Sequence, residues 1–417
     1  MTRWIAERLG TSPWGGCEHS ADTAVVDVRA LRDASGNPPA VIRDYIDTAV
    51  AHWREGRTVV ICCDYGVSRS NAVAAGVLSV LTGQSYDATI AEVIAATGEQ
   101  QIKLDFAMDV RVALEESPRD SNNRGTVVIG SEGFLGRALT RALADECTGC
   151  SDADGASLSA SPVLLDARLG HQAPARLLCC WHPPQLDTNV AAGRLITGLR
   201  NVLEVCRLRG IGIVFISGHQ VFAARNDQVM YRCTEDEEPK PAGAAGDGLY
   251  LAEQLVRVYA SRHGVDALVV RPTHLYGPGD ERPSFLNTFM RKALAGSEID
   301  THHFVNGAPS VDVLHVDDFA RGVVLAIRNG VTGVMHFASG DYPSTAELAG
   351  QIVRIAGSGS KIREINLPGQ CSHNVLDASR ARSILGWKPE IALAEGLGQA
   401  LAHIKINTVN KEGSNSK

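Results

Sequence analysis

The chain has 417 residues, enough for two or three domains of ordinary size, and a formal net charge of −7. With 44% hydrophobic and 21% charged residues it has the composition of a globular protein, which excludes a disordered or collagen-like chain. The negative charge argues against a dedicated nucleic-acid-binding protein, because neutralising phosphates needs a basic surface. The sequence has neither the roughly 18 consecutive apolar residues of a membrane helix nor the apolar core of a secretory signal, so we expect a cytoplasmic protein without a membrane partner.

The ten cysteines give no pattern of paired or metal-binding residues. Cys62–Cys63 and Cys179–Cys180 are adjacent pairs within apolar, strand-like runs, and Cys147 and Cys150 form a lone C-x-x-C in a polar stretch. Zinc sites and disulfide frameworks use more regular spacings than these. We therefore expect reduced thiols and no metal.

In chain order, the first predicted elements are a buried strand over 24–28, a helix over 41–53, a strand over 58–62 and a helix over 71–81. Two amphipathic helices follow, over 86–96 and 106–115. These elements make up an expected first domain, residues 1–116. The polar stretch 117–125 is rich in turn-forming residues and is the expected linker.

After the linker, apolar strands alternate with helical segments. The expected strands are 126–130, 162–166, 176–181, 212–217 and 267–272. This alternation predicts parallel strands joined by crossover helices, which is a doubly wound α/β sheet, over residues 126–406. Residues 407–417 are polar and are expected to form a flexible tail.

The first candidate site joins the strand at 58–62 to the following helix. Its residues are Cys63, Asp64, Tyr65, Gly66, Val67, Ser68, Arg69 and Ser70. The backbone N–H groups of such a loop can surround a phosphate group, and the N-terminus of the helix adds positive potential. Arg69 can hold two phosphate oxygens, and the same field favours a thiolate nucleophile at Cys63. The alternative is a buried strand cysteine followed by an arginine on a helix surface.

The C-x5-R-S pattern resembles the compact dual-specificity branch of the protein tyrosine phosphatases, over about residues 24–116. The resemblance implies that Cys63 is the nucleophile, that Arg69 and the loop 64–69 bind phosphate, and that Ser70 assists release of the thiolate. It also implies an upstream acid that protonates the leaving oxygen. Asp33 has the right separation and loop setting for that acid, and Asp27 is its rival.

One residue of the first site departs from the phosphatase pattern. The histidine that normally precedes the nucleophile is replaced by Cys62. The expected activity is still that of a phosphoric monoester hydrolase without a cofactor. Its expected substrate is a small phosphorylated metabolite, such as a nucleotide or a sugar phosphate.

The second candidate site is the G-x-x-G-x-x-G segment at 130–136, directly after a strand and at the start of a helix. Glycines there allow a tight turn and let a pyrophosphate approach the helix N-terminus. The surrounding strand and helix favour a dinucleotide-binding fold. The candidate cofactor-binding residues of the turn are Gly130, Gly133, Phe134, Leu135 and Gly136.

The turn and three later segments resemble the extended short-chain dehydrogenase/reductases, the NAD-dependent epimerase/dehydratase family, over about residues 126–403. The later segments are RPTHLYGPGD (271–280), LHVDDFARG (314–322) and 376–397. The resemblance implies a Rossmann-type sheet with a small C-terminal substrate lobe that binds a nucleotide-sugar, and NAD or NADP as the cofactor. It implies that Asp166 lies on the adenine side of the cofactor, with Asp152 and Asp154 as weaker candidates. It also implies a homodimer formed through the segments 197–207 and 250–262.

The chain departs from this second family at the catalytic positions. Gly218 stands where the family has a catalytic hydroxyl, and Ala245 and Leu249 stand at the tyrosine and lysine of Y-x-x-x-K. We therefore expect a degenerate domain without ordinary hydride chemistry. Its candidate site residues are Ser217, His219, Tyr250 and His274. The two histidines are either substitutes in acid–base chemistry or hydrogen-bonded structural residues.

The main interpretation is therefore a cysteine-dependent phosphatase domain fused to a degenerate epimerase-like domain of dinucleotide-binding fold. A first alternative is an NAD(P)-dependent oxidoreductase, epimerase or dehydratase that acts on a nucleotide-sugar-like substrate and carries an accessory phosphatase domain. A second alternative is a non-catalytic scaffold that binds phosphorylated ligands. In every interpretation the partner is a small molecule rather than a nucleic acid.

Overall fold

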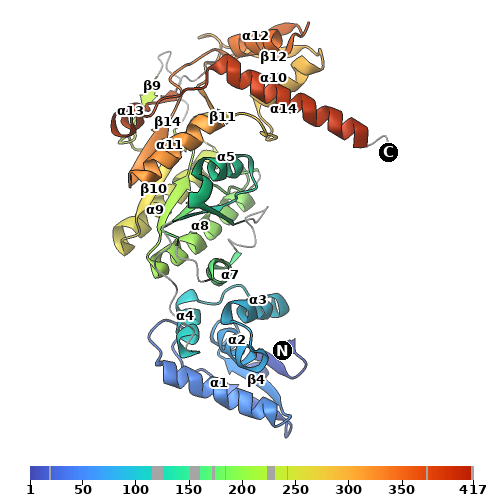
Figure 1. Cartoon of the computed structure of the whole chain (residues 1–417), viewed down its shortest axis with the longest axis vertical. Coiled ribbons are helices and arrows are strands. Elements are labelled where there is room, and N and C mark those ends of the chain that lie inside the picture. Colours follow the sequence, from blue (N-terminus) through green and yellow to red (C-terminus); the bar gives the residue numbers. More distant parts are fainter. Residues whose placement is uncertain are drawn as a thin grey trace. The chain divides into compact units, whose positions relative to one another are not determined.

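The computed structural model describes residues 1–17, 20–114, 125–150, 160–170, 174–183, 185–222, 231–241, 243–371 and 374–414. The chain divides into two compact units, which are described separately (Figure 1). Unit 1 comprises Met1–Arg124, Gly155–Ala175 and Thr197–Ile211, and unit 2 comprises Gly125–Asp154, Arg176–Ile196 and Gly212–Lys417. In the part of the chain that the structure describes, no helix has the length and apolarity needed to cross a bilayer.

Unit 1 contains a four-stranded mixed sheet in the order β1-β2-β4-β3. Its strands are β1 (Arg3–Ala6), β2 (Leu9–Pro13), β3 (Thr23–Asp27) and β4 (Thr58–Cys63). β1 runs antiparallel to β2, and β4 runs parallel to both of its neighbours. The apolar run of β4 is buried from Val59 to Cys63, as expected for a central strand covered on both faces.

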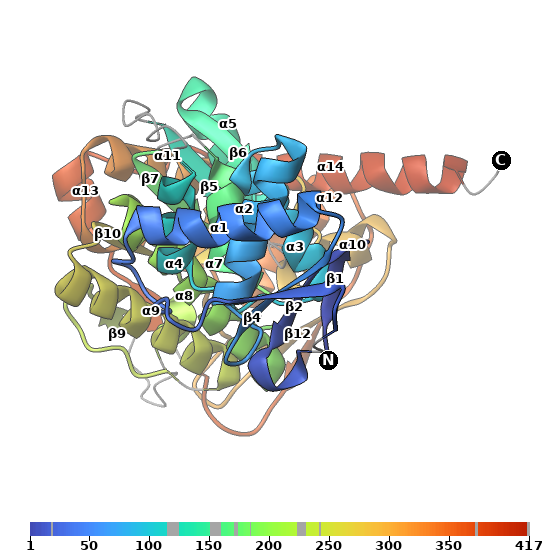
Figure 2. The same ribbon diagram turned by 90° about the horizontal axis from the view of Figure 1, so that it is seen from below.

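Four helices pack around the sheet of unit 1. They are α1 (Pro39–Arg54), α2 (Arg69–Thr82), α3 (Tyr86–Thr97) and α4 (Leu104–Ala113). α2 contacts the other three helices, and Figure 2 shows α1 lying across α2 and α4. Residues Ser70 to Ser79 of α2 are all buried, which explains why the sequence of this helix is apolar on every side.

Unit 2 is built on a six-stranded sheet in the order β14-β10-β8-β7-β5-β6, and every pair of neighbouring strands is parallel. The strands are β5 (Thr126–Ile129), β6 (Cys147–Cys150), β7 (Arg176–Cys179), β8 (Gly212–Ile216), β10 (Ala267–Pro272) and β14 (Gly333–Phe337). The predicted α/β sheet of Rossmann type is therefore confirmed. Parallel order also places the carboxyl ends of all six strands at one edge of the sheet, where ligands bind in such folds.

The core of unit 2 lies between this sheet and two helices that contact each other, α5 (Phe134–Leu143) and α11 (Val316–Arg328) (Figure 1). Trp387 completes the core: its ring meets Phe337 edge to face, and its Nε1 donates to the Asp318 carbonyl oxygen at 3.0 Å. The Asp318 carboxylate in turn accepts backbone N–H bonds from Glu390 and Ile391. This cluster fixes the chain that leads into the C-terminal helix.

The remaining elements of unit 2 form further small sheets and a helical layer. The paired short strands are β11 (His274–Tyr276) with β13 (Val313–His315), β12 (Ile299–His303) with β15 (Ile362–Asn366), and β9 (Tyr231–Cys233) with β16 (Asn374–Leu376). The helices are α9 (Ala244–His263), α10 (Phe285–Leu294), α12 (Thr345–Ala356), α13 (Ser379–Leu385) and α14 (Leu393–Ser414). α10, α12 and α14 contact one another around a second apolar core, which is the expected small C-terminal lobe (Figure 1).

Two predictions made from the sequence are wrong. The expected strand over 162–166 is helix α7 (Pro162–Leu169), because Pro162 occupies the first helical turn and the hydroxyl of Ser161 caps it by accepting the Val163 N–H. The expectation of reduced thiols fails at Cys17 and Cys62, which form a disulfide. The predicted linker, except Gly125, and the weaker candidates Asp152 and Asp154 lie outside the described residues.

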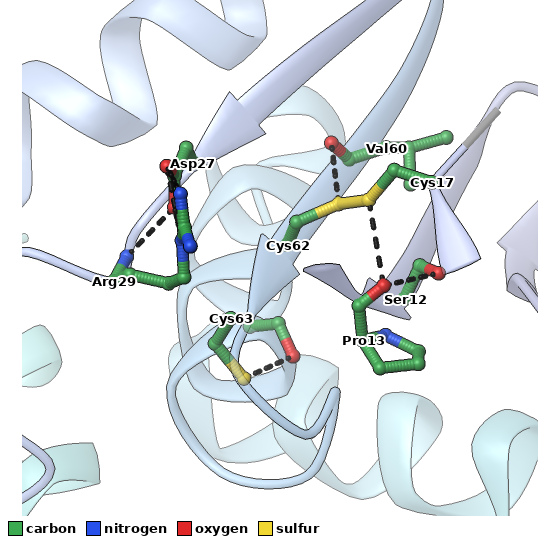
Figure 3. Close-up of a disulfide and its surroundings, with 9 residues drawn as sticks. Ser12, Pro13, Cys17, Asp27, Arg29, Val60, Cys62 and Cys63 are labelled. Carbon is green, nitrogen blue, oxygen red and sulfur yellow. Dashed lines mark hydrogen bonds and ion pairs between the residues drawn. A yellow bond between two sulfur atoms is a disulfide. The ribbon is translucent and has the colours of Figure 1, made fainter. Parts of the chain in front are cut away.

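The disulfide follows from strand pairing in unit 1. Ser12 of β2 is the register partner of Cys62 of β4, and a single 3₁₀ turn, Trp14–Gly16, carries the chain on to Cys17. Successive side chains of a strand point to opposite faces, so Cys63 points away from the disulfide that Cys62 forms (Figure 3). The sulfur of Cys63 is left as a thiol on the other face of β4.

Candidate functional site

The glycine-rich turn of unit 2 begins where β5 ends. Gly130 has a φ of +86°, which side chains disfavour, and its carbonyl oxygen accepts the Gly133 N–H at 3.2 Å. A Cβ on Gly136 would overlap that carbonyl oxygen and come within 2.6 Å of Ser131 Cα, so only glycine fits there. The tight turn brings the free N–H groups at the start of α5 to the carboxyl edge of the sheet.

This turn has the form of a pyrophosphate cradle. Gly133 is the residue before the first turn of α5, and a Cβ there would meet only the Gly130 carbonyl oxygen, at 3.4 Å. A side chain at Gly133 would therefore occupy the space through which the phosphate oxygens of a ligand would approach. The predicted residues Phe134 and Leu135 form the first turn of α5. The described residues of the turn thus fit a dinucleotide phosphate group.

Asp166, the predicted adenine-side residue, belongs to unit 1 and is engaged in an ion cluster there. It is 1% exposed on α7 in unit 1, where its Oδ1 accepts from Arg209 Nε at 2.6 Å and its Oδ2 lies 3.0 Å from the Arg111 guanidinium. Arg111 also pairs with Asp87 of α3. The carboxylate therefore holds α4, α7 and α8 (Asn189–Arg209) together. Its role on the adenine side of a cofactor stays a prediction.

A cavity of about 260 Å³ adjoins the turn in unit 2. Leu135 of α5 lines one side, and the other walls come from residues that follow the carboxyl ends of β7, β8 and β10. Its polar lining residues are His182, Ser217, His219, Gln220, Thr273, His274, Tyr276, Arg282 and Ser284. Three of the four predicted residues of this site, Ser217, His219 and His274, are thus brought together.

Two histidines are stacked in the cavity wall. The rings of His219 and His274 lie 4.1 Å apart, and the edge of the His274 ring also meets Phe285 of α10. Burial, together with the neighbouring His274, lowers the pKa of His219 well below its usual value. Burial lowers the pKa of His274 to about 4, with a smaller contribution from Arg282. Both imidazoles are therefore neutral at physiological pH.

A third imidazole, His182, was not predicted. It follows β7, and its Nε2 donates to the Ile216 carbonyl oxygen at 2.7 Å, because a carbonyl can only accept. Burial lowers its pKa to about 4. Its only signal in the sequence was its place after an apolar strand at the ligand edge of a parallel sheet.

The structure explains how the catalytic positions of the resembled family are filled. A Cβ on Gly218 would overlap the Gln220 side-chain oxygen and lie 3.4 Å from Leu249 Cδ1. The amide of Gln220 therefore occupies the space beside Gly218. The apolar Leu249 lines the cavity at the position where the resembled family has a lysine. Tyr250 is not among the lining residues: its hydroxyl donates to Glu238, which raises its pKa.

Behind the cavity, a buried polar network anchors Ser217. Its hydroxyl donates to Glu253 Oε1 at 2.5 Å, and the same carboxylate receives two hydrogen bonds from Arg271, at 2.9 and 2.6 Å. All three side chains are less than 5% exposed. The network ties β8, α9 and β10 together and gives the cavity a fixed wall.

The loop predicted as a phosphate site in unit 1 is also formed. Gly66 has a φ of +68°, and a Cβ there would lie 2.5 Å from the Pro13 nitrogen, so this position requires glycine. Asn71 donates to the carbonyl oxygens of Gly66 and Val67, and the Ser68 hydroxyl accepts the Lys103 N–H. The Tyr65 side chain is 81% exposed. Phosphate binding by residues 64–69 stays a prediction.

The polar groups of that loop already have partners within the protein. Arg69 donates to the carbonyl oxygens of Arg29 and Leu31, each at 2.9 Å, and pairs with Asp64. Cys63 is 2% exposed, and its thiol donates to the Ser70 hydroxyl at 3.3 Å. Of the two candidate acids, Asp33 pairs with Lys103 at 3.2 Å and Asp27 pairs with Arg29 at 2.8 Å.

Comparisons with known proteins find relatives of one enzyme type. Residues 186–337 match the family described as the NAD dependent epimerase/dehydratase family. A dTDP-glucose 4,6-dehydratase from Streptomyces niveus is 31% identical over 169 residues, which cover 40% of this chain and 48% of that protein. A UDP-glucuronate 4-epimerase from Thermodesulfobacterium geofontis is 26% identical over 215 residues, covering 51% and 65% of the two chains. The chain thus spans about half to two thirds of these relatives.

Solved structures show the same fold. A UDP-glucose 4-epimerase from Thermotoga maritima has a TM-score of 0.58 at 20% identity, covering 68% of this chain and 99% of that one. A dTDP-glucose 4,6-dehydratase from Bacillus anthracis in complex with NAD has a TM-score of 0.59 at 16% identity, covering 68% and 97%. At this level of identity the likeness establishes the Rossmann-type fold alone.

These findings overturn the expected main function. The matched proteins are epimerases, dehydratases and reductases rather than phosphoric monoester hydrolases, and the comparisons give no support for a phosphatase-like domain. The expected alternative, an enzyme of the epimerase/dehydratase type, agrees with them better. The comparisons thus show that residues 186–337 are similar to the NAD dependent epimerase/dehydratase family, a match that covers less than half of the chain.

Proposed function

We propose that unit 2 binds a nicotinamide dinucleotide at the turn 130–136 and acts on a nucleotide-sugar-like substrate as an oxidoreductase, epimerase or dehydratase. The observation that carries this proposal is the continuity between the turn and the cavity, which share Leu135. A ligand held by its phosphates at the start of α5 would extend its reactive end along the sheet edge toward that cavity.

The relatives support the same chemistry. Their names include dehydratases and epimerases of dTDP-glucose, UDP-glucuronate and UDP-glucose, and related solved structures contain NAD or NADPH. The cofactor, when bound, supplies the hydride acceptor or donor that such reactions need. The choice between NAD and NADP depends on the adenosine side, where Asp152 and Asp154 lie outside the described residues.

The chain's own residues would bind the phosphates, accommodate the sugar and move the proton. The N–H groups at the start of α5 hold the phosphates, and Gly130, Gly133 and Gly136 keep that space open. The cavity lies close to the lower end of small-molecule pockets, which begin near about 300 Å³, so it suits one sugar ring rather than a whole nucleotide-sugar. With Leu249 at the family's lysine position, a proton must move through cavity groups such as His219 and His274.

The experiment uses the purified full-length chain. NADH and NADPH are titrated while energy transfer from tryptophan to the reduced nicotinamide is followed, and nucleotide-sugars are then added with the oxidised cofactor while absorbance at ~340 nm is recorded. We expect saturable binding of one dinucleotide per chain and a nucleotide-sugar-dependent signal or product. Failure of both dinucleotides to bind would overturn the proposal.

A further inference from the structure

We infer that Arg282 binds the diphosphate of a sugar nucleotide at the rim of the cavity in unit 2, so that the sugar ring enters the cavity and the nucleoside stays outside it. The inference rests on the proposed function, since it assumes that a sugar nucleotide is the substrate. It goes beyond that function by assigning a residue to the substrate's phosphates, whereas the start of α5 accounts only for those of the dinucleotide.

Arg282 is the charged side chain among the described residues that line the cavity, since the histidines are neutral. Its side chain is 54% exposed, which places it at the rim of the cavity rather than in its floor. Burial, and to a smaller extent the charge of Arg282, lowers the pKa of both His182 and His274. The positive charge therefore acts on groups inside the cavity.

The protein holds the guanidinium of Arg282 in one orientation. Its Nε donates to Asp280 Oδ1 at 2.7 Å, and its Nη2 donates to Asp280 Oδ2 at 3.0 Å. Nη2 also donates to the Leu275 carbonyl oxygen at 2.9 Å. Because the Asp280 side chain is only 3% exposed, it is a fixed support for the arginine.

These contacts use the N–H of Nε and both N–H groups of Nη2, and they leave Nη1 unused. A guanidinium has two N–H groups on each terminal nitrogen. Among the described residues, none accepts a hydrogen bond from Nη1 of Arg282. An arginine that is already oriented binds a phosphate oxygen well, because the hydrogen bond is charge-assisted and little side-chain freedom is lost on binding.

The segment that carries Arg282 is also attached to the start of α5. The guanidinium carbon lies 4.7 Å from the centre of the Phe134 ring, which is a cation–π contact with the first turn of α5. From the same helix, Arg137 donates to the Gly279 carbonyl oxygen at 3.4 Å. Arg282 therefore contacts the glycine-rich turn of the cofactor site as well as the cavity.

The size of the cavity indicates which phosphates Arg282 would meet. A volume of about 260 Å³ suits one sugar ring, so the diphosphate that joins this ring to its nucleoside must lie at the rim. Its negative charges lose part of their hydration there and need a cation nearby. The apolar Leu249 supplies none, and Arg282 is the cation at the rim.

The test measures binding to the full-length protein loaded with NADH, by calorimetry at neutral pH. UDP-glucose is compared with UDP and with uridine, and the series is repeated with guanosine and thymidine nucleotides, so that the choice of base does not decide the result. We expect the diphosphates to bind about tenfold more tightly than the nucleoside. This difference should shrink at high salt, because the contact joins opposite charges at an exposed position.

Replacing Arg282 assigns the difference to this side chain. Arg282→Gln should weaken binding of UDP and UDP-glucose about tenfold and change that of uridine less than about twofold. Arg282→Lys keeps the charge but not the planar fork, and should recover part of the loss. NADH affinity should stay within about twofold in both variants.

Arg363→Gln is the matched control. Arg363 of β15 is 58% exposed and pairs with Asp300 at 2.7 Å, so it resembles Arg282 in exposure and in pairing, but it does not line the cavity. Exposed ion pairs contribute little to stability, so the variants at both arginines should fold. Arg363→Gln should bind every ligand as the unmodified chain does.

The outcomes separate the inference from the proposed function. Unchanged UDP-glucose affinity in Arg282→Gln would overturn the inference, and so would a loss of uridine affinity as large as that of UDP. A loss of NADH affinity alone would assign Arg282 to the phosphates of the dinucleotide and would overturn it as well. Absence of NADH binding in the unmodified chain would instead refute the proposed function.

Discussion

The carboxylate of Asp166 is a buried acidic group of unit 1. It is 1% exposed and bonds to the guanidinium groups of both Arg209 and Arg111. Removing one member of a buried ion cluster leaves the opposite charges without compensation, which costs about 3–5 kcal/mol. The stability of unit 1 should therefore depend on this one side chain.

Replacing Asp166 with asparagine tests that role. We expect Asp166→Asn to lower the free energy of unfolding by about 3 kcal/mol in urea titrations, since the amide keeps the shape but loses the charge. NADH affinity should not change, because the carboxylate is already engaged by Arg111 and Arg209. A variant with unchanged stability and weakened NADH binding would support the cofactor role and refute the structural one.

His336 of β14 gives the protein a specific dependence on pH. It is fully buried, and burial together with the nearby Arg271 lowers its pKa to about 3. The unfolded chain binds this proton at the ordinary value near 6.5, so the unfolded state gains protons first on acidification. The contribution of His336 to stability is therefore complete above about pH 6.5 and is lost as the pH falls toward 3.

The change in unfolding free energy between two pH values tests the role of His336. Between pH 6.5 and pH 5 the wild-type chain should lose about 2 kcal/mol through His336 alone. In His336→Gln that part of the loss should disappear, while the contributions of the other histidines stay in both proteins. Chemical denaturation of both proteins at each pH gives the comparison. Identical pH dependence of the two would contradict the assignment.

The residues of the cavity show what a sequence can and cannot reveal about a site. Ser217, His219 and His274 could be predicted because they follow strands whose carboxyl ends meet at one sheet edge. The stacking of His219 on His274 could not be predicted, because it depends on how the segments after β8 and β10 fold. The role of Gln220 was hidden for the same reason: its amide folds back beside Gly218.

At the scale of elements, the β5–α5 turn is the segment with the least tolerance for added atoms. The proximity of the Gly130 carbonyl means that Gly136→Ala must displace backbone, and we expect a loss of about 1–3 kcal/mol in unfolding free energy. Gly193→Ala is the control, because its Cβ would meet nothing within 4 Å on α8, and should stabilise by about 0.5–1 kcal/mol. Thermal melts of both variants measure this difference in stability. Equal changes in stability in the two variants would contradict the close packing at Gly136.

Most elements could be predicted from periodicity, and the exceptions have physical causes. The predicted helices of unit 1 agree with α1 to α4 to within a few residues, because each has a clear apolar face or an apolar run. β1 was missed because its side chains are mostly exposed and offer no buried pattern. α7 was mistaken for a strand because PVLLD is short and apolar, and such runs do not distinguish strand from helix.

On the scale of the whole molecule, each unit has its own sheet, and the disulfide belongs to unit 1 alone. The bond could not be predicted, since it depends on the parallel pairing of β2 with β4, and β2 itself was not predicted. The expected domain limits of 1–116 and 126–406, and the homodimer through 197–207 and 250–262, stay predictions.

The disulfide leads to a prediction about unfolding. It joins residues 45 positions apart, and a cross-link of that span stabilises by roughly 4 kcal/mol through the unfolded chain. We expect two calorimetric transitions. A dithiol reductant should lower the midpoint temperature of one, and NADH should raise the midpoint temperature of the other. The double variant Cys17→Ser/Cys62→Ser should resemble the reduced protein and no longer respond to the reductant. A wild-type melting curve that reductant leaves unchanged would contradict the prediction.

The central claim is that a dinucleotide phosphate binds at the start of α5, and a charge placed at Gly133 tests it most directly. Aspartate and asparagine are both favourable at this helix-capping position, and a Cβ there meets only the Gly130 carbonyl oxygen, so both variants should fold. Only Gly133→Asp sets a negative charge against the phosphates. In NADH titrations we predict that Gly133→Asp binds at least tenfold more weakly than Gly133→Asn, with the gap shrinking at high salt. Equal NADH affinity in both variants and in the unmodified chain would contradict the account.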